Sequence, residues 1–101
     1  MAIMAVSVTP IGTGSTSVGG YVAEAVRVVE ESGLKFEVRA MHTEVEGDLR
    51  QLPALVPKIH RACFALGARR LSTVIKIDDR RDAPSSIAGK VRSVRRRRLP
   101  V

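Results

Sequence analysis

The stretch that decides the fold is residues 34–47, LKFEVRAMHTEVEG. Apolar and charged side chains alternate over residues 34–41, and a second short extended segment, residues 43–46, ends at Gly47. Alternation with a period of two is typical of a β-strand with one face on a core. Two strands this close in sequence pair as antiparallel neighbours, because a parallel return needs a dozen or more residues. The sequence therefore predicts a β-hairpin in the middle of the chain.

A strand and a helix are predicted before the hairpin. Residues 2–9 alternate in the same way and end at the glycine-rich segment 10–16. The hydroxyl of Ser17 can cap a following helix, and Gly33 suits the left-handed position just past the end of that helix. Apolar side chains recur at spacings of three and four residues, which places on one helix face Val18, Val22, Ala25, Val26 and Val29.

A second helix is predicted after the hairpin, from a cap at Asp48 to an end at Gly67. Its apolar positions keep helical spacing between those two residues. Pro53 fits the first turn of a helix that begins near Leu52, but Pro57 removes one backbone hydrogen bond. We therefore expect a helix that is bent or that starts late.

The remaining segments complete a β-α-β-β-α-β order. Residues 71–78 alternate and predict the last strand. Ser85 or Ser86 can begin a short helix, before residues 95–98 fray into solvent. This order is the signature of an α+β, ferredoxin-like sandwich, in which two helices cover one face of a four-stranded antiparallel sheet. The other face of the sheet is then open for a ligand or another subunit.

The positive charge of the chain is concentrated at its carboxyl end. The 101 residues fit one domain and contain 17 Lys and Arg against 10 Asp and Glu. Six cations fall in the last dozen residues, which leaves 11 cations and 10 anions in residues 1–89. We assign residues 1–94 to a ligand-binding domain and residues 95–101 to a basic tail. The near-neutral domain argues against a nucleic-acid partner; a regulatory or nucleic-acid-associated module that uses the arginine tail is the alternative function.

Composition also bears on location and partners. A hydrophobic fraction of 45% supplies a core, and so short a chain gains stability from self-association. Cys63 is alone, so no disulfide forms within the chain, in keeping with a reducing cytoplasm. The first residues lack the pattern of a signal peptide, and no apolar run approaches the roughly 20 residues of a membrane span. We expect a cytoplasmic protein with no membrane partner.

Motifs for catalysis or metal binding are incomplete. The glycine-rich loop lacks the lysine of a phosphate-binding loop, so we interpret it as a flexible connection or a partial lid over a ligand. His60 and Cys63 are too few for a zinc site, and Cys63 is better explained as a buried thiol. Cations interrupt the carboxylates of residues 76–82, which favours ion pairs over metal binding. No spacing indicates a Ser-His-acid set, so we predict no catalytic residue, no metal site and no required cofactor.

The hairpin segment 41–47 concentrates polar chemistry in a short run. It holds a hydroxyl, two carboxylates and an imidazole, which belong to Thr43, Glu44, Glu46 and His42. One interpretation is a polar hairpin end, which is common. The other is a hydrogen-bonding, anionic rim for a cationic or amino-bearing ligand. Composition alone leaves both interpretations open.

Several short pieces of the sequence, between about residues 4 and 94, carry a resemblance to a known family. The strongest piece is residues 75–82, Ile75-Lys76-Ile77-Asp78-Asp79-Arg80-Arg81-Asp82. The others are Pro10-Ile11-Gly12, Ser17-Val18, Tyr21-Val22-Ala23, Ser32-Gly33-Leu34, Met41 with Thr43, Val45-Glu46-Gly47, Lys90-Val91 and Ser93-Val94. In this order and spacing, the pieces resemble the thiamine-binding-like family of small ferredoxin-like proteins.

The resemblance implies a ligand, an assembly and a set of contact residues. It implies binding of thiamine or its hydroxymethylpyrimidine part without a known reaction, by subunits that pair through their sheets as a homodimer or, commonly, a homotetramer. At matching positions, Thr43 and Glu46 become ligand contacts and Met41 packs against the ring, with His42 and Glu44 beside them. An aminopyrimidine donates hydrogen bonds to a carboxylate, and a thiazolium cation favours an anionic rim.

Two positions depart from the family pattern. Residue 42 is His where the family tends to have Gly, and residue 61 is Arg where the family tends to have Glu. We expect the imidazole of His42 to fill or reshape the ligand pocket.

Overall fold

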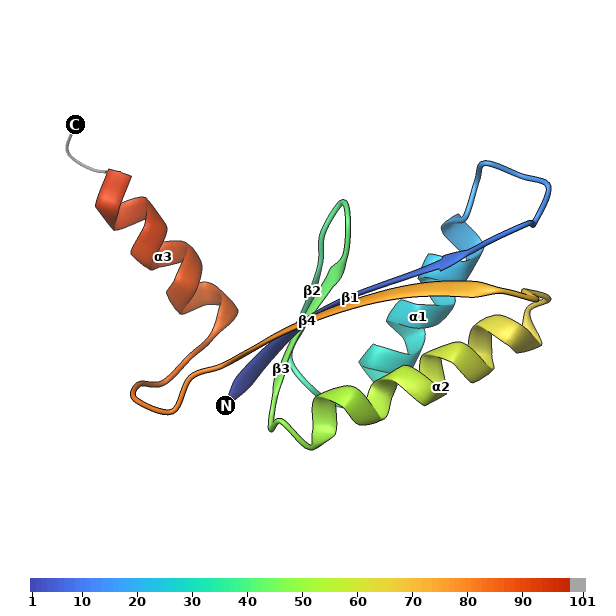
Figure 1. The fold of residues 1–101 in the computed structure, drawn as a ribbon. Helices are drawn as coiled ribbons and strands as arrows, with labels where there is room; N and C mark the ends of the chain where they lie inside the picture. The colour runs from blue at the N-terminus through green and yellow to red at the C-terminus, as the bar shows by residue number, and fades with distance from the viewer. Residues whose placement is uncertain (99–101) are drawn as a thin grey trace.

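The computed structural model describes residues 1–98, and this part of the chain forms four strands and three helices (Figure 1). The elements in chain order are β1 (Ala2–Pro10), α1 (Gly19–Glu31), β2 (Phe36–Val38), β3 (Thr43–Gly47), α2 (Gln51–Ala65), β4 (Leu71–Asp79) and α3 (Ile87–Arg98). This is the predicted order. No helix within residues 1–98 is both long and apolar enough to cross a membrane.

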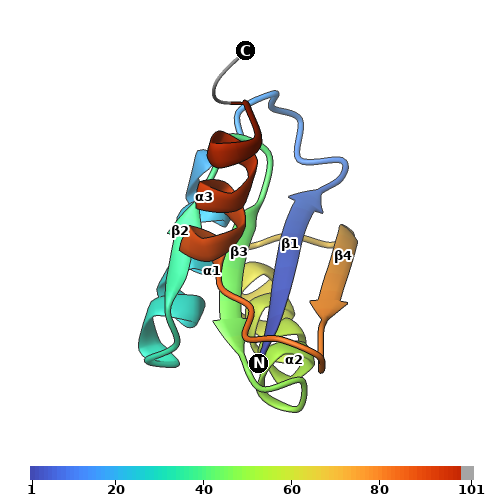
Figure 2. The same ribbon diagram turned by 90° about the vertical axis from the view of Figure 1, so that its left-hand side faces the viewer.

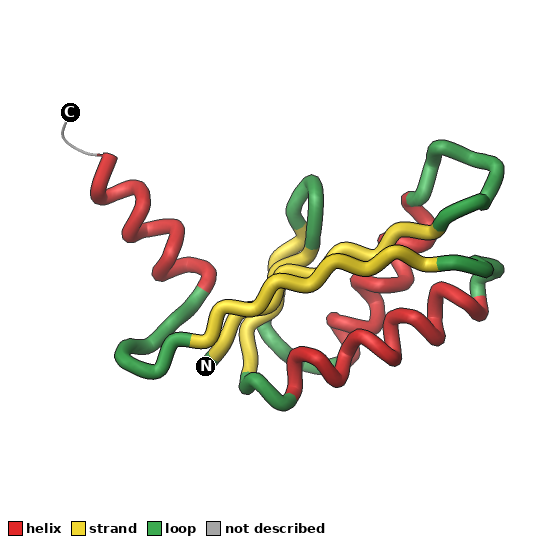
Figure 3. Tube along the Cα trace, viewed as in Figure 1, coloured by secondary structure: helices red, strands yellow, loops and turns green. Residues whose placement is uncertain are grey.

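The strands form one sheet in the order β2-β3-β1-β4, and every neighbouring pair is antiparallel. Helices α1 and α2 cover one side, the closed face, and Figure 3 shows both of them beneath the strands. The other side is the open face. Figure 2 shows α3 in front of the open face, with α1 and α2 behind the sheet. The predicted α+β ferredoxin-like sandwich is confirmed, with α3 as an addition on the open face.

The core lies between the closed face and its two helices. Alternate residues of β1 point into it, and Met4 of β1 stands opposite Val45 of β3. The largest fully buried side chains are Met4, Leu52, Ile59, Val29, Val45 and Cys63. The core is therefore aliphatic, as the low aromatic content of 3% requires.

The hairpin is confirmed, but its first strand is shorter than predicted. Strand β2 covers residues 36–38, inside the predicted range 34–41, and Phe36 pairs with Val45. The amide of Arg39 donates to the carbonyl of His42 at 2.9 Å and closes the turn. Strand pairing ends there because the chain reverses direction.

Two predicted helix caps are wrong. Helix α1 has Val18 as its N-cap, not Ser17. At the start of α2, the amides of Gln51 and Leu52 donate to the backbone carbonyl of Asp48, at 2.9 and 3.2 Å. A backbone carbonyl thus takes the place of the predicted side-chain cap and satisfies amides that the first helical turn leaves unpaired.

The buried stripe of α1 also differs from the predicted one. Val28 and Val29 are buried, whereas Val22 is 40% exposed. Valines occupy more than one face of this helix, so spacing alone does not decide which of them packs on the sheet.

Helix α2 starts close to the predicted position. It begins at Gln51, one residue before the expected Leu52, and Pro53 lies in its first turn. Pro57 lies inside the helix. Gly67 follows the helix with a φ of 120°, a left-handed conformation that favours glycine, as predicted for the helix end.

Helix α3 extends further than predicted. Ser86 Oγ accepts a hydrogen bond from the amide of Gly89 at 2.9 Å, which confirms the predicted start. Residues 95–98, expected to fray, form the last turn, where cations interact favourably with the carboxyl end of a helix. The helix passes through the predicted domain boundary at Val94. The rest of the predicted tail, residues 99–101, lies outside the described residues.

Candidate functional site

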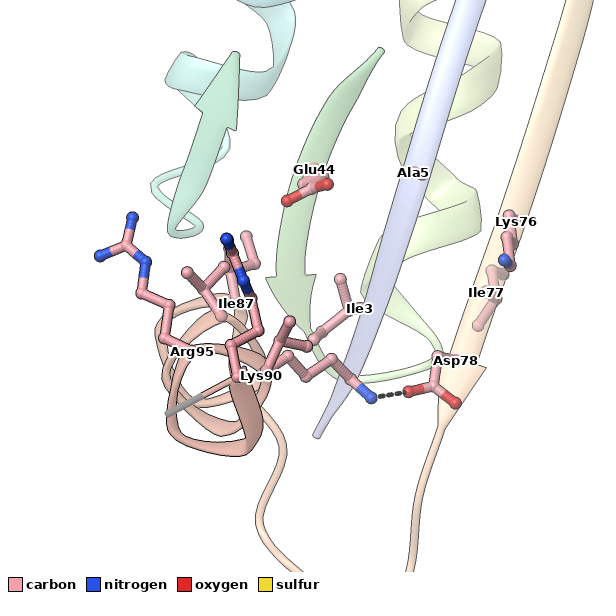
Figure 4. A pocket seen from close by; sticks show the side chains of 12 residues that line it. Ile3, Ala5, Glu44, Lys76, Ile77, Asp78, Ile87, Lys90 and Arg95 are labelled. Carbon is pink, nitrogen blue, oxygen red and sulfur yellow. Dashed lines mark ion pairs between the residues drawn. The ribbon is translucent and has the colours of Figure 1, made fainter. Parts of the chain in front are cut away.

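A groove of about 720 Å³ lies between the open face of the sheet and α3. Its apolar lining consists of Ile3, Ala5, Ile77, Ile87, Val91 and Val94. Its charged lining consists of Glu44, Lys76, Asp78, Lys90, Arg95 and Arg98. Figure 4 shows that these side chains come from the sheet on one side and from α3 on the other. The volume lies within the range of about 300–1,000 Å³ that small-molecule sites occupy.

Helix α3 is anchored over the open face at its amino end. The amide of Ile87 donates to Oε1 of Glu46 at 2.5 Å, and both residues are buried. A carboxylate at this end of a helix is also favoured by the helix dipole. Further along α3, Val91 and Val94 are 37% and 59% exposed. Only the first turn of α3 is therefore packed tightly, and the groove opens beside the following turns.

An ion pair connects α3 to β4 across the groove. Nζ of Lys90 lies 2.5 Å from Oδ2 of Asp78, and Figure 4 marks this pair with a dashed line. The hydrogen bond from Lys90 holds the pKa of the Asp78 carboxyl below its usual range, and the charges of Arg80 and Lys76 act in the same direction. The Asp78 carboxyl is therefore fully ionised at neutral pH.

Strand β3 places the predicted contacts on two different faces. Glu44 and Glu46 point to the open face, where Glu44 lines the groove. Thr43 lies opposite Val6, whose side chain is buried in the core, so Thr43 belongs to the closed face. The structure does not bring Thr43 and Glu46 together, because strand residues three positions apart point to opposite sides.

His42 and Glu44 are the predicted contacts that the structure brings together. Nε2 of His42 lies 2.9 Å from Oε2 of Glu44. Nε of Arg39 lies 4.0 Å from the other oxygen of that carboxylate. Met41 lies at the hairpin turn with 82% of its surface exposed. The carboxylate of Glu46 already accepts a hydrogen bond from the amide of Ile87 in α3. The carboxylate of Glu44 is thus the predicted contact that is both oriented and accessible from the groove.

The groove also uses residues that the sequence pattern did not single out as a site. Helix α3 supplies Lys90, Val91, Val94, Arg95 and Arg98, and β1 supplies Ile3 and Ala5. Ile87, Val91 and Val94 recur at spacings of four and three residues, which is typical of an apolar helix face, and such a face needs a surface to pack on. That spacing was the available indication of a site, although it does not identify the surface.

Of the other motifs, the glycine-rich loop, His60 and Cys63 lie away from the groove, whereas the segment 76–82 contributes to its lining. The glycine-rich loop joins the far end of β1 to α1 (Figure 1), and none of its residues lines the groove, so a lid over this groove is not supported. Cys63 is buried, as predicted, and burial raises the pKa of its thiol. Nε2 of His60 lies 2.6 Å from Oγ1 of Thr73 and links α2 to β4. Asp79 and Asp82 make local ion pairs, as predicted, and Asp78 pairs with Lys90 of α3. Within residues 1–98, no three His, Cys, Asp or Glu side chains lie close enough to hold a metal ion.

Comparison with known proteins identifies the family. Residues 4–95 match the sequence profile of the family described as thiamine-binding protein. The chain belongs to this family. Its relatives include UPF0045 protein YqgV of Bacillus subtilis (strain 168), which is 39% identical over 99% of this chain and 100% of that protein. A UPF0045 protein of Methanothermobacter thermautotrophicus is 41% identical over 88% of this chain and 91% of that protein. The family description names binding, and none of these descriptions names a reaction.

Solved structures share the fold of this thiamine-binding family member. Hypothetical protein MJ1052 of Methanocaldococcus jannaschii matches with a TM-score of 0.85 and 32% identity, over 92% of this chain and 94% of that chain. A Thermotoga maritima protein, described as a candidate thiamine biosynthesis or salvage protein, matches with a TM-score of 0.78 over 92% of this chain and 97% of that chain. At 22% identity, the second likeness shows the fold alone.

Proposed function

We propose that this protein binds thiamine or a related hydroxymethylpyrimidine in the groove beside α3, without catalysing a reaction. The observation that carries the proposal is the carboxylate of Glu44, which lines the groove and is oriented by His42 at 2.9 Å. Membership of the thiamine-binding protein family supplies the ligand class.

The groove offers the two kinds of contact that an aminopyrimidine needs. A carboxylate accepts hydrogen bonds from the amino group, and such charge-assisted bonds are stronger than neutral ones. Ile3, Ala5 and Val91 supply aliphatic surface for the faces of the ring. A ligand held between the sheet and α3 would lose part of its contact with water, which strengthens the hydrogen bond to the carboxylate.

The predicted contacts then divide by role. Glu44 is the principal contact, and His42 is its positioning partner because it fixes the carboxylate. Glu46 supports the site by anchoring α3 through the amide of Ile87. Thr43 belongs to the closed face and Met41 lies at the exposed turn, so neither residue lines the groove. Direct contact of the ligand with either of them stays a prediction.

Self-association is part of the proposal, as a homodimer or a homotetramer. Strand β4 is the last in the sheet order, so one of its edges is unpaired within residues 1–98. Val74, Ile75 and Ile77 of this strand are 66%, 42% and 37% exposed. An unpaired edge with exposed apolar side chains is a template for pairing with a strand of a second chain.

The proposed role is that of a carrier, sensor or salvage component in the cytoplasm. The family description names binding and no reaction, which favours such a role over that of an enzyme. In this role the pyrimidine is the ligand, and no cofactor is required.

Isothermal titration calorimetry on the full-length protein tests ligand binding. We expect heat of binding with thiamine and with hydroxymethylpyrimidine. Glu44→Gln should weaken binding about tenfold or more, because a hydrogen bond to a charged group contributes about 1.5–3 kcal/mol. Glu30→Gln makes the same charge change on the exposed side of α1 and should leave the affinity unchanged.

The proposal fails if the folded protein binds neither compound at millimolar concentration. Equal weakening by Glu44→Gln and Glu30→Gln would remove Glu44 from the site. Light scattering on the same samples measures the oligomeric state, and a monomer at all protein concentrations would contradict self-association.

The arginine-rich end of α3 supports one alternative. Helix α3 carries six cations and no acidic residue. Such a run can contact polyanions without sequence specificity. Gel shifts that compare the full chain with a chain ending at Val94 test this role, and equal affinity for nucleic acid would exclude the tail from it.

A further inference from the structure

The side chains that line the groove include more cations than carboxylates, and this excess of positive charge bears on the charge of the ligand. The lining contains two carboxylates, and both are engaged: Asp78 by Lys90 and Glu44 by His42. The lining also contains Lys76, Arg95 and Arg98. None of these three cations makes an ion pair with a side chain of residues 1–98. A ligand in the groove therefore meets one oriented carboxylate and three cations that are available to an anion.

These cations come from two different walls of the groove. Arg95 and Arg98 lie three residues apart in the last turn of α3, which places them on one side of the helix. Lys76 lies on β4, opposite Ala5 of β1, and both residues line the groove. Figure 4 shows Arg95 on the helix side and Lys76 on the strand side, with Glu44 in the sheet between them. An anionic group near the end of α3 would thus meet Arg95 and Arg98 first, while Lys76 adds positive charge on the opposite wall.

We propose that the ligand of this groove is a phosphomonoester of the aminopyrimidine, such as thiamine monophosphate or hydroxymethylpyrimidine phosphate. The inference rests on the proposed function, because it keeps the pyrimidine ring at Glu44. It adds that Arg95 and Arg98 bind the phosphate group, with Lys76 on the facing wall. A phosphomonoester carries a charge of about −1.5 to −2 at neutral pH. Guanidinium groups match phosphate oxygens with paired hydrogen bonds.

The same charges disfavour the unphosphorylated cation. Thiamine carries a positive thiazolium ring, which the three available cations of the groove repel. A phosphate group on thiamine makes the net charge of the ligand negative, so the cations of the groove attract the ligand instead of repelling it. The volume of about 720 Å³ also leaves room for a substituent beside the ring. Charge complementarity therefore favours the phosphorylated form within one ligand class.

Calorimetry on the full-length protein distinguishes the forms. The probes are thiamine, thiamine monophosphate, hydroxymethylpyrimidine, its phosphate, and inorganic phosphate, each at low and at high salt. We expect the monophosphates to bind at least about tenfold more tightly than the unphosphorylated compounds at low salt, because both phosphate contacts are charge-assisted. The difference should shrink at high salt, since the arginines are exposed and screened. Inorganic phosphate alone should bind more weakly than the monophosphates because it lacks the ring.

A matched pair of double variants locates the phosphate contact. Arg95→Gln with Arg98→Gln removes two charges that line the groove, and Arg96→Gln with Arg97→Gln removes two charges of the same helix turn that do not. The first variant should lose the preference for the monophosphates and still bind hydroxymethylpyrimidine. The second should keep the preference. All four positions are exposed, so neither variant is expected to unfold, and circular dichroism checks this.

The remaining outcomes separate this inference from the proposed function. If the unphosphorylated compounds bind and a phosphate group adds no affinity, the inference is overturned and the proposed function stands. If no pyrimidine compound binds, both are overturned. If inorganic phosphate binds as tightly as the monophosphates, or both double variants lose affinity equally, the arginines attract anions generally and the inference is also overturned.

Discussion

Met4 and Ile3 are neighbours in β1 that point to opposite faces of the sheet and lie in different surroundings. Met4 is fully buried in the core, whereas Ile3 lines the groove. In β3, Val45 and Glu44 differ in the same way. Side chains of one strand thus divide between a face packed on the aliphatic core and a face that combines aliphatic surface with charge. The closed face carries the core and the open face carries the groove, so we expect that either can be altered while the other is kept.

The open face tolerates the buried carboxylate of Glu46 because this group has a hydrogen-bond partner. Glu46 is only 8% exposed, which would be costly for an isolated carboxylate. The amide of Ile87 donates to it at 2.5 Å and offsets that cost. The contact joins residues 41 positions apart and anchors α3. The groove thus depends on one buried carboxylate, while the core depends on many aliphatic contacts.

The largest expected effect comes from breaking the closed face. Met4→Ala should lower the free energy of unfolding by about 2–5 kcal/mol, because it leaves a cavity in a packed core. Ile3→Ala, one residue away on the open face, should cost about 1 kcal/mol, since that side chain is only partly buried. Guanidinium unfolding followed by circular dichroism measures both values at one protein concentration, because self-association would shift the midpoint. Equal losses would show that the two faces contribute alike.

A smaller effect is expected when α3 is released from the open face. Glu46→Ala removes the acceptor of the Ile87 amide, and loss of such a cap costs about 1–2 kcal/mol. Protection of the α3 amides against hydrogen exchange should then fall about five- to thirtyfold, because a free-energy change of about 1–2 kcal/mol changes the opening equilibrium by that factor. Protection of the β1 amides should be unchanged.

Glu44→Ala is the matched control for this release. Glu44 lies on the same face of the same strand and lines the groove, but it accepts no hydrogen bond from α3. Its removal should leave the exchange of the α3 amides unchanged. Wild-type exchange rates in Glu46→Ala would mean that the contact with Ile87 does not hold the helix.

Local periodicity was sufficient to predict the sheet. Alternation in residues 2–9 placed Met4, Val6 and Val8 on one face, and all three are buried. The short separation of the two hairpin strands required antiparallel pairing, which the structure has. Periodicity was less decisive in α1, where Val28 rather than Val22 is buried. An alternating strand has one apolar face, whereas several valine stripes on a helix leave the choice to tertiary packing.

The site was less predictable because it depends on contacts between distant segments. The sequence resemblance paired Thr43 with Glu46, although a spacing of three in a strand already implies opposite faces. The groove itself exists because the chain turns back after β4 and places α3 in front of the open face of the sheet (Figure 2). Apolar spacing in α3 predicts a packing face but not which surface it meets. The arginines of its last turn were interpreted as a tail for the same reason.

The smallest expected effect concerns the second attachment of α3, the ion pair of Lys90 with Asp78. Both side chains are about half exposed, so solvent screens the pair. The pKa of Asp78 is lowered in the folded protein, chiefly by the hydrogen bond from Lys90, so the folded state binds a proton less tightly than the unfolded chain does. The contribution of the pair to stability is therefore complete above the ordinary pKa of an aspartate. It is lost as the pH falls through the lowered pKa of Asp78.

Lys90→Met should therefore reduce the protection of the α3 amides at neutral pH, and the difference from the wild-type protein should disappear in acid, below both pKa values. Lys58→Met removes one positive charge from the exposed side of α2 and is the control. It measures how much a change in net charge alone alters amide protection as the pH falls. A difference that persists unchanged in acid would mean that the aliphatic stem of Lys90, rather than its charge, holds α3 to the sheet. In that case the open face would resemble the closed face in its physics, because apolar packing and not charge would keep its covering helix in place.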